Sequence, residues 1–309
     1  MAITFYNAQE TANLISFTNL TRALKDVVLE YADGLIQSPD RQVLTIPDAR
    51  EGVLLSMPAT AQDICAHKLI SLLPDNPQQG RPTIQGMVSV LDSRTGQPIC
   101  VLNGPTVTAR RTAAMSMLGI QSYLPEAPKS IVMIGAGTQA QAHIEAINEL
   151  FPQAQLWIAA RASSLAKAQA LCAHYEHLSL RMQAIDLQRL PEDYDVVITL
   201  TTALEPIYHA PAKVGCLIVA VGAYRPHMCE IAPETVLASQ CFVDDLVGAA
   251  HEAGDFLRAK KDWSQVQTLA HTLRHPVDFN QAILFKTVGT AAWDLAAARV
   301  AYQEIKKAE

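Results

Sequence analysis

The sequence predicts an α/β protein of two domains, one of which is built around a doubly wound parallel sheet. Its 309 residues exceed the usual size of one compact domain. Half of the residues are hydrophobic and only 17% are charged, which suits layered strands buried on both faces and excludes a disordered chain. From residue 130 to about 245, strand-like runs alternate with helix-like segments, the pattern of a parallel sheet with crossover helices.

The first part of the chain predicts a helix, a meander of strands and a second helix. Apolar residues such as Leu14, Leu24 and Val28 recur at helical spacing and indicate a helix over 8–32. The strand-like runs that follow are 42–46, 52–57, 63–72, 84–91 and 98–102. A helix over about 105–121 ends this part, and the segment 125–129 marks the expected crossover into the second domain.

The alternating region predicts its elements in a regular order. They are strand 130–134, helix 138–150, strand 155–160, helix 163–176, and strands 181–185, 195–199, 216–221 and 240–244. A last, alanine-rich helix is expected from Lys286 to about Lys306 and returns to the first domain. The predicted domains are therefore residues 1–124 plus 283–309, and residues 125–282.

The strand over 130–134 runs directly into a glycine turn, Gly135-Ala136-Gly137-Thr138-Gln139-Ala140, and then into a helix. Gly135 permits the tight turn, Gly137 lets the backbone approach a pyrophosphate, and Ala140 lets the helix pack closely on the strand. The helix N-terminus would face the phosphates. This arrangement predicts a dinucleotide-binding unit of the Rossmann type, with residues 135–139 at the cofactor.

The end of the next strand indicates which dinucleotide is bound. An NAD site usually carries an acidic residue there for the ribose hydroxyls, whereas this chain has Ala160 and Arg161. A guanidinium can bind a 2′-phosphate through two charge-assisted hydrogen bonds, and Ser163 adds a hydroxyl donor. We therefore expect NADPH (NADP) as the cofactor, with NADH as the less favoured alternative. A solvated surface arginine is the other interpretation of Arg161.

Charge and composition exclude several classes of partner. The net charge is −6 and no basic run occurs, which argues against nucleic acid. No apolar run reaches the length of a membrane span, and residues 1–20 resemble neither a signal nor a transit peptide. The six cysteines form no CxxC pair and no metal-ligand spacing. We therefore expect a cytoplasmic protein with reduced thiols and no metal site.

Three cations precede the glycine turn at places from which a strand or helix could direct them into a cleft. Arg41 stands before a strand, Lys68 lies inside the apolar run 63–72, and Arg111 lies near the start of a helix. A lysine among apolar strand residues is costly to bury unless an anion meets it, the alternative being a side chain that reaches solvent at a sheet edge. Arg111 suits a carboxylate bound at a helix N-terminus, although a solvated arginine is equally consistent with the sequence.

Taken in order, these segments resemble the ornithine cyclodeaminase and mu-crystallin family. The resemblance rests on Arg41, Met57-Pro58-Ala59, Lys68, TARRTAA over 108–114, GAGTQAQAH over 135–143 and Val221-Gly222-Ala223. It covers nearly the whole chain and implies a Rossmann domain inserted into a second, α+β domain for substrate binding and dimerisation. A homodimer is the assembly that it implies.

The resemblance also implies roles for individual residues. Arg41, Lys68 and Arg111 would bind the α-carboxylate of a substrate, and Lys68 would also have a catalytic role. The remaining cofactor contacts would come from Thr201, Val221, Val288 and Gly289.

Position 224 favours one branch of the family. Cyclodeaminases carry an aspartate there, whereas this chain has Tyr224 followed by Arg225, neither of which can replace a carboxylate base at neutral pH. The segment instead resembles that of the ketimine reductases. Glu230 is assigned no role in the site, and Asp244 and Asp245 are interpreted as a strand end and a helix cap as readily as ligands.

The expected reaction is therefore the NADPH-dependent reduction of a cyclic α-imino acid, Δ1-pyrroline-2-carboxylate or Δ1-piperideine-2-carboxylate. Hydride transfer to the imine carbon would give L-proline or L-pipecolate. The alternatives are deamination, as in ornithine cyclodeaminase or the alanine dehydrogenases of the family, and a non-catalytic NADP-dependent binding protein.

Overall fold

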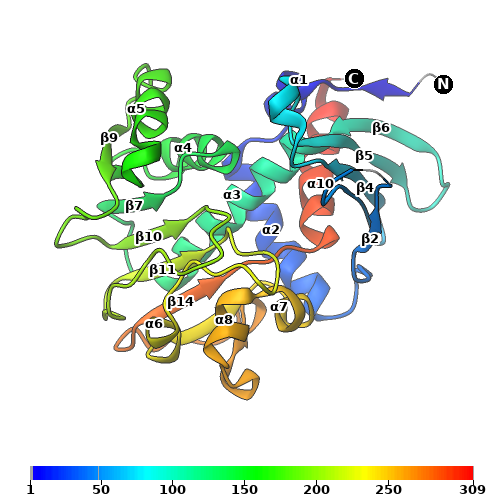
Figure 1. Ribbon diagram of the computed structural model, residues 1–309. Coiled ribbons are helices and arrows are strands. Elements are labelled where there is room, and N and C mark those ends of the chain that lie inside the picture. The colour runs from blue at the N-terminus through cyan, green and yellow to red at the C-terminus, as the bar shows by residue number, and fades with distance from the viewer. Residues whose placement is uncertain (1–2, 48, 309) are drawn as a thin grey trace. The chain divides into compact units, whose positions relative to one another are not determined.

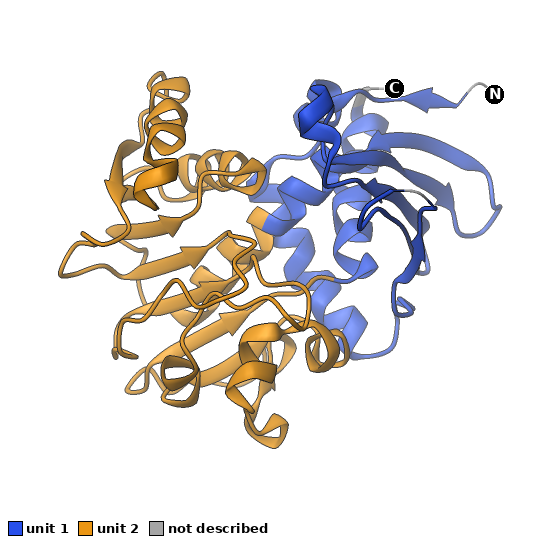
Figure 2. Cartoon of the chain, viewed as in Figure 1, with its two compact units in different colours: residues 1–112, 290–309 blue, residues 113–289 orange. Residues whose placement is uncertain are grey.

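The computed structural model describes residues 3–47 and 49–308, and the chain divides into two compact units. Figure 2 shows them in blue, residues 1–112 with 290–309, and in orange, residues 113–289. The sequence predicts the divisions near 124 and 283. The two compact units divide after residues 112 and 289, and the sheet of the second unit includes a strand over 283–286.

The first unit is built on a six-stranded sheet in the order β1-β6-β5-β4-β3-β2. The strands are β1 (Thr4–Phe5), β2 (Gln42–Thr45), β3 (Val53–Thr60), β4 (Ile64–Leu72), β5 (Ile84–Asp92) and β6 (Pro98–Asn103). Neighbours are antiparallel except β1 and β6. Between β4 and β5 lies the short 3-10 turn η1 (Asn76–Gln79). The predicted strand meander is therefore present.

Helices cover one face of this sheet. The helices of this unit are α1 (Ala8–Leu14), α2 (Phe17–Ala32), the start of α3 (Gly104–Tyr123) and α10 (Ala291–Ala308). Of these, α10 packs on β4 and β3, α1 contacts β6, and α2 packs on α10 (Figure 1). Along β4, Ile64, Ala66, Lys68 and Ile70 are buried, while the residues between them are partly exposed. Because alternate strand residues share a face, Lys68 points to the same side as this apolar core.

The helix predicted over 8–32 is wrong in one respect, because it is two helices. Ser16 takes an extended conformation and its hydroxyl accepts a hydrogen bond from the backbone N–H of Asn19 at 3.3 Å. A serine in this position caps a new helix N-terminus. The first helix ends at Leu14, and the apolar spacing continues across the break.

The second unit holds an eight-stranded, wholly parallel sheet in the order β13-β12-β14-β11-β10-β7-β8-β9. Its strands are β7 (Ser130–Ile134), β8 (Gln155–Ala160), β9 (Arg181–Asp186), β10 (Val196–Thr199), β11 (Leu217–Ala220), β12 (Gln240–Val243), β13 (Gln267–Thr268) and β14 (Ile283–Lys286). The predicted doubly wound α/β fold is confirmed. From β7 the chain proceeds to one side through β8 and β9, and then to the other side through β10 and β11 (Figure 1).

The helices of this unit connect successive strands. They are α4 (Thr138–Leu150), α5 (Leu165–His174), α6 (Pro233–Leu237), α7 (Leu246–Glu252), α8 (Gly254–Ala259) and α9 (Leu269–Thr272), with 3-10 turns η2 (Ala162–Ser164) and η3 (Trp263–Gln265). In open sheets of this kind, ligands bind at the carboxyl ends of the strands where the strand order reverses. That point lies between β7 and β10.

The helix expected from Lys286 is also a wrong prediction. Residues Ile283–Lys286 form β14, which pairs with β11 on one side and β12 on the other. Gly289 then takes a φ of 80°, a left-handed conformation that interrupts a helix, and α10 begins only at Ala291. A run of four apolar residues is too short to show the period of a strand or of a helix, so the sequence pattern does not separate this strand from the helix that follows it.

Candidate active site

Lys68, Arg111 and Asp294 form a buried ionic cluster in the first unit. Lys68 Nζ lies 2.6 Å from Asp294 Oδ2, and Arg111 Nε lies 3.4 Å from Asp294 Oδ1. Lys68 comes from β4, Arg111 from α3 and Asp294 from the first turn of α10. Lys68 and Asp294 are each 1% exposed, so both charges are removed from water. The sequence alternative of a lysine reaching solvent at a sheet edge is thereby excluded.

The electrostatics of this cluster favour an additional anion. Burial lowers the pKa of Lys68 to about 8. The charge of Asp294 raises this pKa, whereas the charges of Arg111 and Arg41 lower it further. Arg41 therefore lies within electrostatic range of Lys68. Two buried cations share the single charge of Asp294, and Arg111 Nε has no hydrogen-bond partner among the described residues. A bound carboxylate would supply the missing negative charge and an acceptor.

The neighbouring Arg110 has a different task. Its Nε donates a hydrogen bond to the backbone carbonyl of Ile15 at 2.7 Å, and its guanidinium lies 3.9 Å from the centroid of the Phe17 ring. Arg110 therefore fixes the junction between α1 and α2, whereas Arg111 contacts Asp294. The sequence alone does not separate the two arginines.

Asp294 is the residue that sequence reasoning missed. It stands in the apolar stretch Ala291-Ala292-Trp293-Asp294-Leu295, where an acidic residue is unusual because burial of an unpaired carboxylate is costly. An acidic residue within an apolar stretch is therefore the sequence signal that could have identified Asp294. Its partners, however, are far away along the chain, so the sequence does not identify them.

The glycine turn of the second unit fits a dinucleotide. Gly135 has a φ of 120°, which favours glycine, and a Cβ there would lie 3.0 Å from the carbonyl oxygen of Leu200. Gly137 caps α4 without any side-chain hydrogen bond, and no atom lies within 4 Å of a Cβ built on it. The first amides of α4 are thus not capped by a side chain and can bind phosphate. Ala140 is fully buried, as expected for a small residue at the packed position.

Arg161 and Ser163 follow β8, the strand next to β7, and both are exposed. Arg161 precedes η2, with an extended backbone and no side-chain capping bond. Among the described residues no hydrogen bond or ion pair of its guanidinium is found. The side chain is therefore available to a ligand at the edge of the predicted cofactor region.

Glu230 organises two loops at the carboxyl ends of adjacent strands. Its carboxylate accepts hydrogen bonds from Thr199 Oγ1 at 2.9 Å and, beyond β10, from Thr201 N at 2.6 Å and Thr201 Oγ1 at 2.8 Å. Beyond β11 it accepts from Gly222 N at 2.7 Å and Ala223 N at 3.0 Å. Burial raises the pKa of this carboxyl. The sequence assigns Glu230 no role, yet it shapes the backbone around the predicted cofactor residue Thr201.

Asp255 supports Glu230 in turn. Its Oδ1 accepts hydrogen bonds from the backbone N–H of Glu230 at 2.6 Å and of Ile231 at 3.0 Å. Its Oδ2 lies 3.1 Å from Nζ of Lys286, at the end of β14. Both charged side chains are fully buried, and their ion pair links the loop after β11 to the neighbouring strand β14.

Asp244 holds the last predicted cofactor segment. It accepts hydrogen bonds from Thr287 Oγ1 at 2.6 Å and from the backbone N–H groups of Val288 and Gly289, each at 2.9 Å. Asp245 is the N-cap of α7, as one of the two sequence interpretations has it. Val221, like Val288, is buried beside these loops at the carboxyl edge of the sheet.

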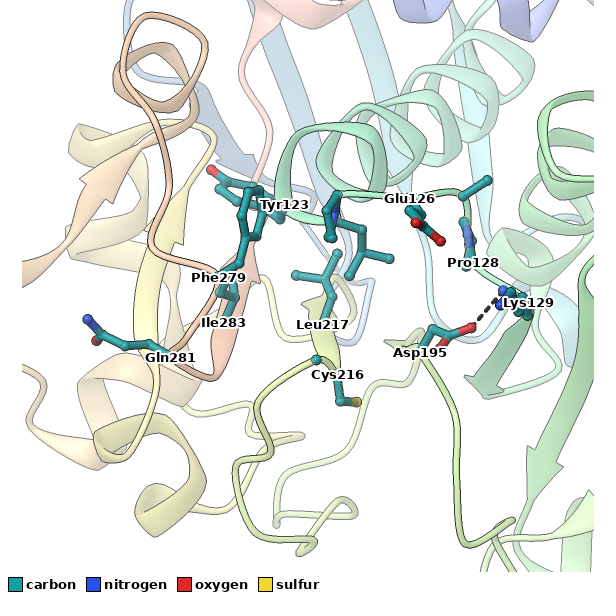
Figure 3. A pocket seen from close by; sticks show the side chains of 14 residues that line it. Tyr123, Glu126, Pro128, Lys129, Asp195, Cys216, Leu217, Phe279, Gln281 and Ile283 are labelled. Atoms are coloured by element: carbon teal, nitrogen blue, oxygen red, sulfur yellow. Dashed lines mark hydrogen bonds between the residues drawn. The ribbon is translucent and has the colours of Figure 1, made fainter.

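A cavity of about 230 Å³ lies at the opposite edge of the same sheet (Figure 3). Lys129, Asp195, Cys216 and Ile283 line it, and they stand at the amino ends of β7, β10, β11 and β14. Asp195 there accepts hydrogen bonds from the backbone N–H groups at the start of β7. Because ligands of such sheets bind at the carboxyl ends, this cavity is not the cofactor site.

Residues 3–47 and 49–308 contain neither a candidate metal site nor a candidate membrane span. No group of three or more His, Cys, Asp or Glu side chains in these ranges is placed to hold a metal ion. No helix within them has both the length and the apolar character needed to cross a membrane.

The model of the ornithine cyclodeaminase/mu-crystallin family matches residues 2–309. The chain belongs to this family. It is 45% identical over 296 residues to Delta(1)-pyrroline-2-carboxylate reductase 2 of Burkholderia ambifaria, covering 96% of this chain and 94% of that relative. It is 44% identical to the Delta(1)-pyrroline-2-carboxylate/Delta(1)-piperideine-2-carboxylate reductase of Azospirillum brasilense, covering 97% and 95%.

A solved structure extends the likeness to three dimensions. It is the Thermococcus litoralis Delta(1)-pyrroline-2-carboxylate reductase in complex with NADH and L-proline, with a TM-score of 0.88 and 26% identity. The match covers 99% of this chain and 98% of that one. Family membership and the fold predicted from the resemblance are thus confirmed.

Proposed function

We propose that this protein catalyses the NADPH-dependent reduction of a cyclic α-imino acid, Δ1-pyrroline-2-carboxylate, Δ1-piperideine-2-carboxylate or both. The products would be L-proline and L-pipecolate. The observation that carries the proposal is the buried cluster in which Lys68 and Arg111 share one carboxylate, because its surplus positive charge suits the carboxylate of the substrate. Relatives at 44–45% identity over almost the whole chain bear the names of such reductases, which supports the substrate class.

In this proposal Arg41, Lys68 and Arg111 bind the carboxylate and so fix the position of the adjacent imine carbon. The bound nicotinamide cofactor supplies the hydride. The hydride would add to the imine carbon while the π electron pair of the C=N bond moves onto nitrogen, which already carries its proton in the iminium form. Lys68 helps to retain or deliver that proton. The cations are tolerable beside an iminium because the substrate carboxylate offsets them.

The cofactor residues in the proposal are Gly135 to Gln139, Arg161, Ser163, Thr201, Val221, Val288 and Gly289. A nicotinamide dinucleotide is supported by the uncapped N-terminus of α4 and by the Thermococcus litoralis relative, which was solved with NADH. NADPH rather than NADH is proposed because Arg161 is exposed and without a partner among the described residues at the end of β8.

We also propose a homodimer in the cytoplasm. Val43 and Leu44 on the edge strand β2 and Met87 on β5 are exposed apolar residues of the first unit's sheet, a feature typical of interfaces. All six cysteines are free thiols, as expected in a reducing compartment. Light scattering of the purified protein tests the dimer through its molar mass.

The experiment that tests the activity follows the absorbance of NADPH with purified protein and each of the two cyclic imines. We expect turnover of at least one imine and a lower KM for NADPH than for NADH. Ammonia release from L-ornithine or L-alanine with NAD would support the deaminase alternative. Cofactor binding without turnover of any substrate would support the binding-protein alternative.

A further inference from the structure

We propose that Asp294 is a positioning residue of the substrate site, whose carboxylate aims the Lys68 ammonium and the Arg111 guanidinium at one anion and keeps Lys68 charged. The inference rests on the proposed function of this cluster. It assigns a task to a residue on α10 that the sequence does not single out.

The geometry provides the first argument. Asp294 contacts Lys68 with one carboxylate oxygen and Arg111 with the other, so it bridges cations from two different elements. An ammonium has three N–H donors and a guanidinium has five. Asp294 lies within ion-pair distance of both groups, although neither of its oxygens has a hydrogen-bond partner among the described residues. It therefore draws both cations to one place by charge, and their N–H donors stay free for an anion. A planar substrate carboxylate needs such pre-set donors.

The charges around Lys68 provide the second argument. The charged groups that act on it are Asp294 on α10, Arg111 on α3 and Arg41 before β2. Its cross-strand neighbours on β3 and β5, Met57 and Val88, are apolar. Asp294 is therefore the only negative group among these neighbours within the described part of the chain. Without it, a desolvated ammonium would face cations alone.

A purely structural ion pair would have a different composition. A buried pair that serves packing is balanced in charge, and apolar residues of similar volume often replace such a pair without loss of stability. Here one carboxylate serves two buried cations, and Arg111 Nε has no hydrogen-bond partner among the described residues. The surplus positive charge is therefore offset only when an anion binds at the cluster.

The test compares Asp294→Asn and Asp294→Glu with a matched control, Asp63→Asn. Asp63 also pairs with a residue of α10, Arg299, but on a half-exposed surface away from the cluster. For each variant with NADPH present, two quantities are measured from about pH 6 to about pH 10. They are the kinetics of imine reduction, with kcat and KM determined separately for the imine, and the Kd of pyrrole-2-carboxylate, a flat carboxylate that the enzyme cannot reduce. The KM for NADPH is determined at neutral pH.

We expect Asp294→Asn to weaken pyrrole-2-carboxylate at least about tenfold at neutral pH and to move the alkaline limb of both profiles about one pH unit lower. Asp294→Glu keeps the charge but displaces it, so KM rises while the alkaline limb stays at the wild-type pH. Asp63→Asn should match the wild type in both readouts. The KM for NADPH should be unchanged throughout.

A folded Asp294→Asn variant with the wild-type Kd and alkaline limb would overturn the proposal. If that variant does not fold, Asp294→Glu decides, because a wild-type KM for the imine would show that the carboxylate position is unimportant. A wild type that reduces no imine refutes the proposed function, whereas the pyrrole-2-carboxylate series still tests Asp294.

Discussion

Replacing Arg161 with glutamine should remove the preference for NADPH without disturbing the fold. The side chain is exposed and its guanidinium has no partner among the described residues, so the free energy of unfolding should change by no more than about 0.5 kcal/mol. Hydrogen bonds to a charged group contribute about 1.5–3 kcal/mol. Because the site is open to solvent, the lower end applies, which corresponds to roughly a tenfold rise in the KM for NADPH.

The assay measures KM for NADPH and for NADH at one saturating imine concentration, with Arg181→Gln as the control. Arg181 opens β9 and pairs in register with Gln155, the first residue of β8, whereas Arg161 follows the last residue of that strand. The two variants lose the same charge at opposite ends of neighbouring strands. The KM for NADH should stay constant in both. An unchanged ratio of the two KM values in Arg161→Gln would refute the assignment of Arg161 to the 2′-phosphate.

Three further predictions concern Lys68, Glu230 and the glycine turn. Since the pKa of Lys68 is about 8, carboxylate binding should be constant below that pH and weaken about tenfold per unit above it. Because this pKa is lowered, the charged form of Lys68 destabilises the folded state below pH 8, and the destabilisation should disappear as the pH rises from 8 towards 10.5, the ordinary pKa of lysine. Urea unfolding of the wild type and of Lys68→Met at several pH values would measure this change in the free energy of unfolding. Glu230→Gln should lower the free energy of unfolding by about 1–3 kcal/mol and raise the KM for NADPH, whereas the exposed Glu234→Gln should do neither. Gly137→Ala should abolish NADPH binding, as measured by fluorescence titration, and should leave the Tm unchanged. Gly135→Ala should abolish binding and also lower the Tm, because the backbone at this position has a positive φ.

The sequence predicts the parallel sheet and the family because these depend on local patterns. Strand, glycine turn and helix follow one another over 130–150, and each carries its own signal. The break at Ser16 and the strand over 283–286 are different cases. A capping serine does not interrupt the apolar period, and a run of four apolar residues has no period of its own.

The chemistry of the site is only partly local. The sequence marks Lys68 as a lysine that needs an anion, yet the carboxylate beside it, Asp294, comes from the last helix. The difference between Arg110 and Arg111 also appears only when Ile15 and Asp294 are placed beside them in space. Such pairings between distant segments are set by packing, which one sequence does not report.

In the proposed reaction, hydride is transferred to the imine carbon of a substrate held by its carboxylate. The most direct measurement uses NADPH deuterated at the transferred position, with Δ1-pyrroline-2-carboxylate as substrate, and analyses the product by NMR and chiral chromatography. We expect L-proline with deuterium at Cα, and loss of this product in Lys68→Met. Unlabelled product, or no proline at all while NADPH binds normally, would contradict it.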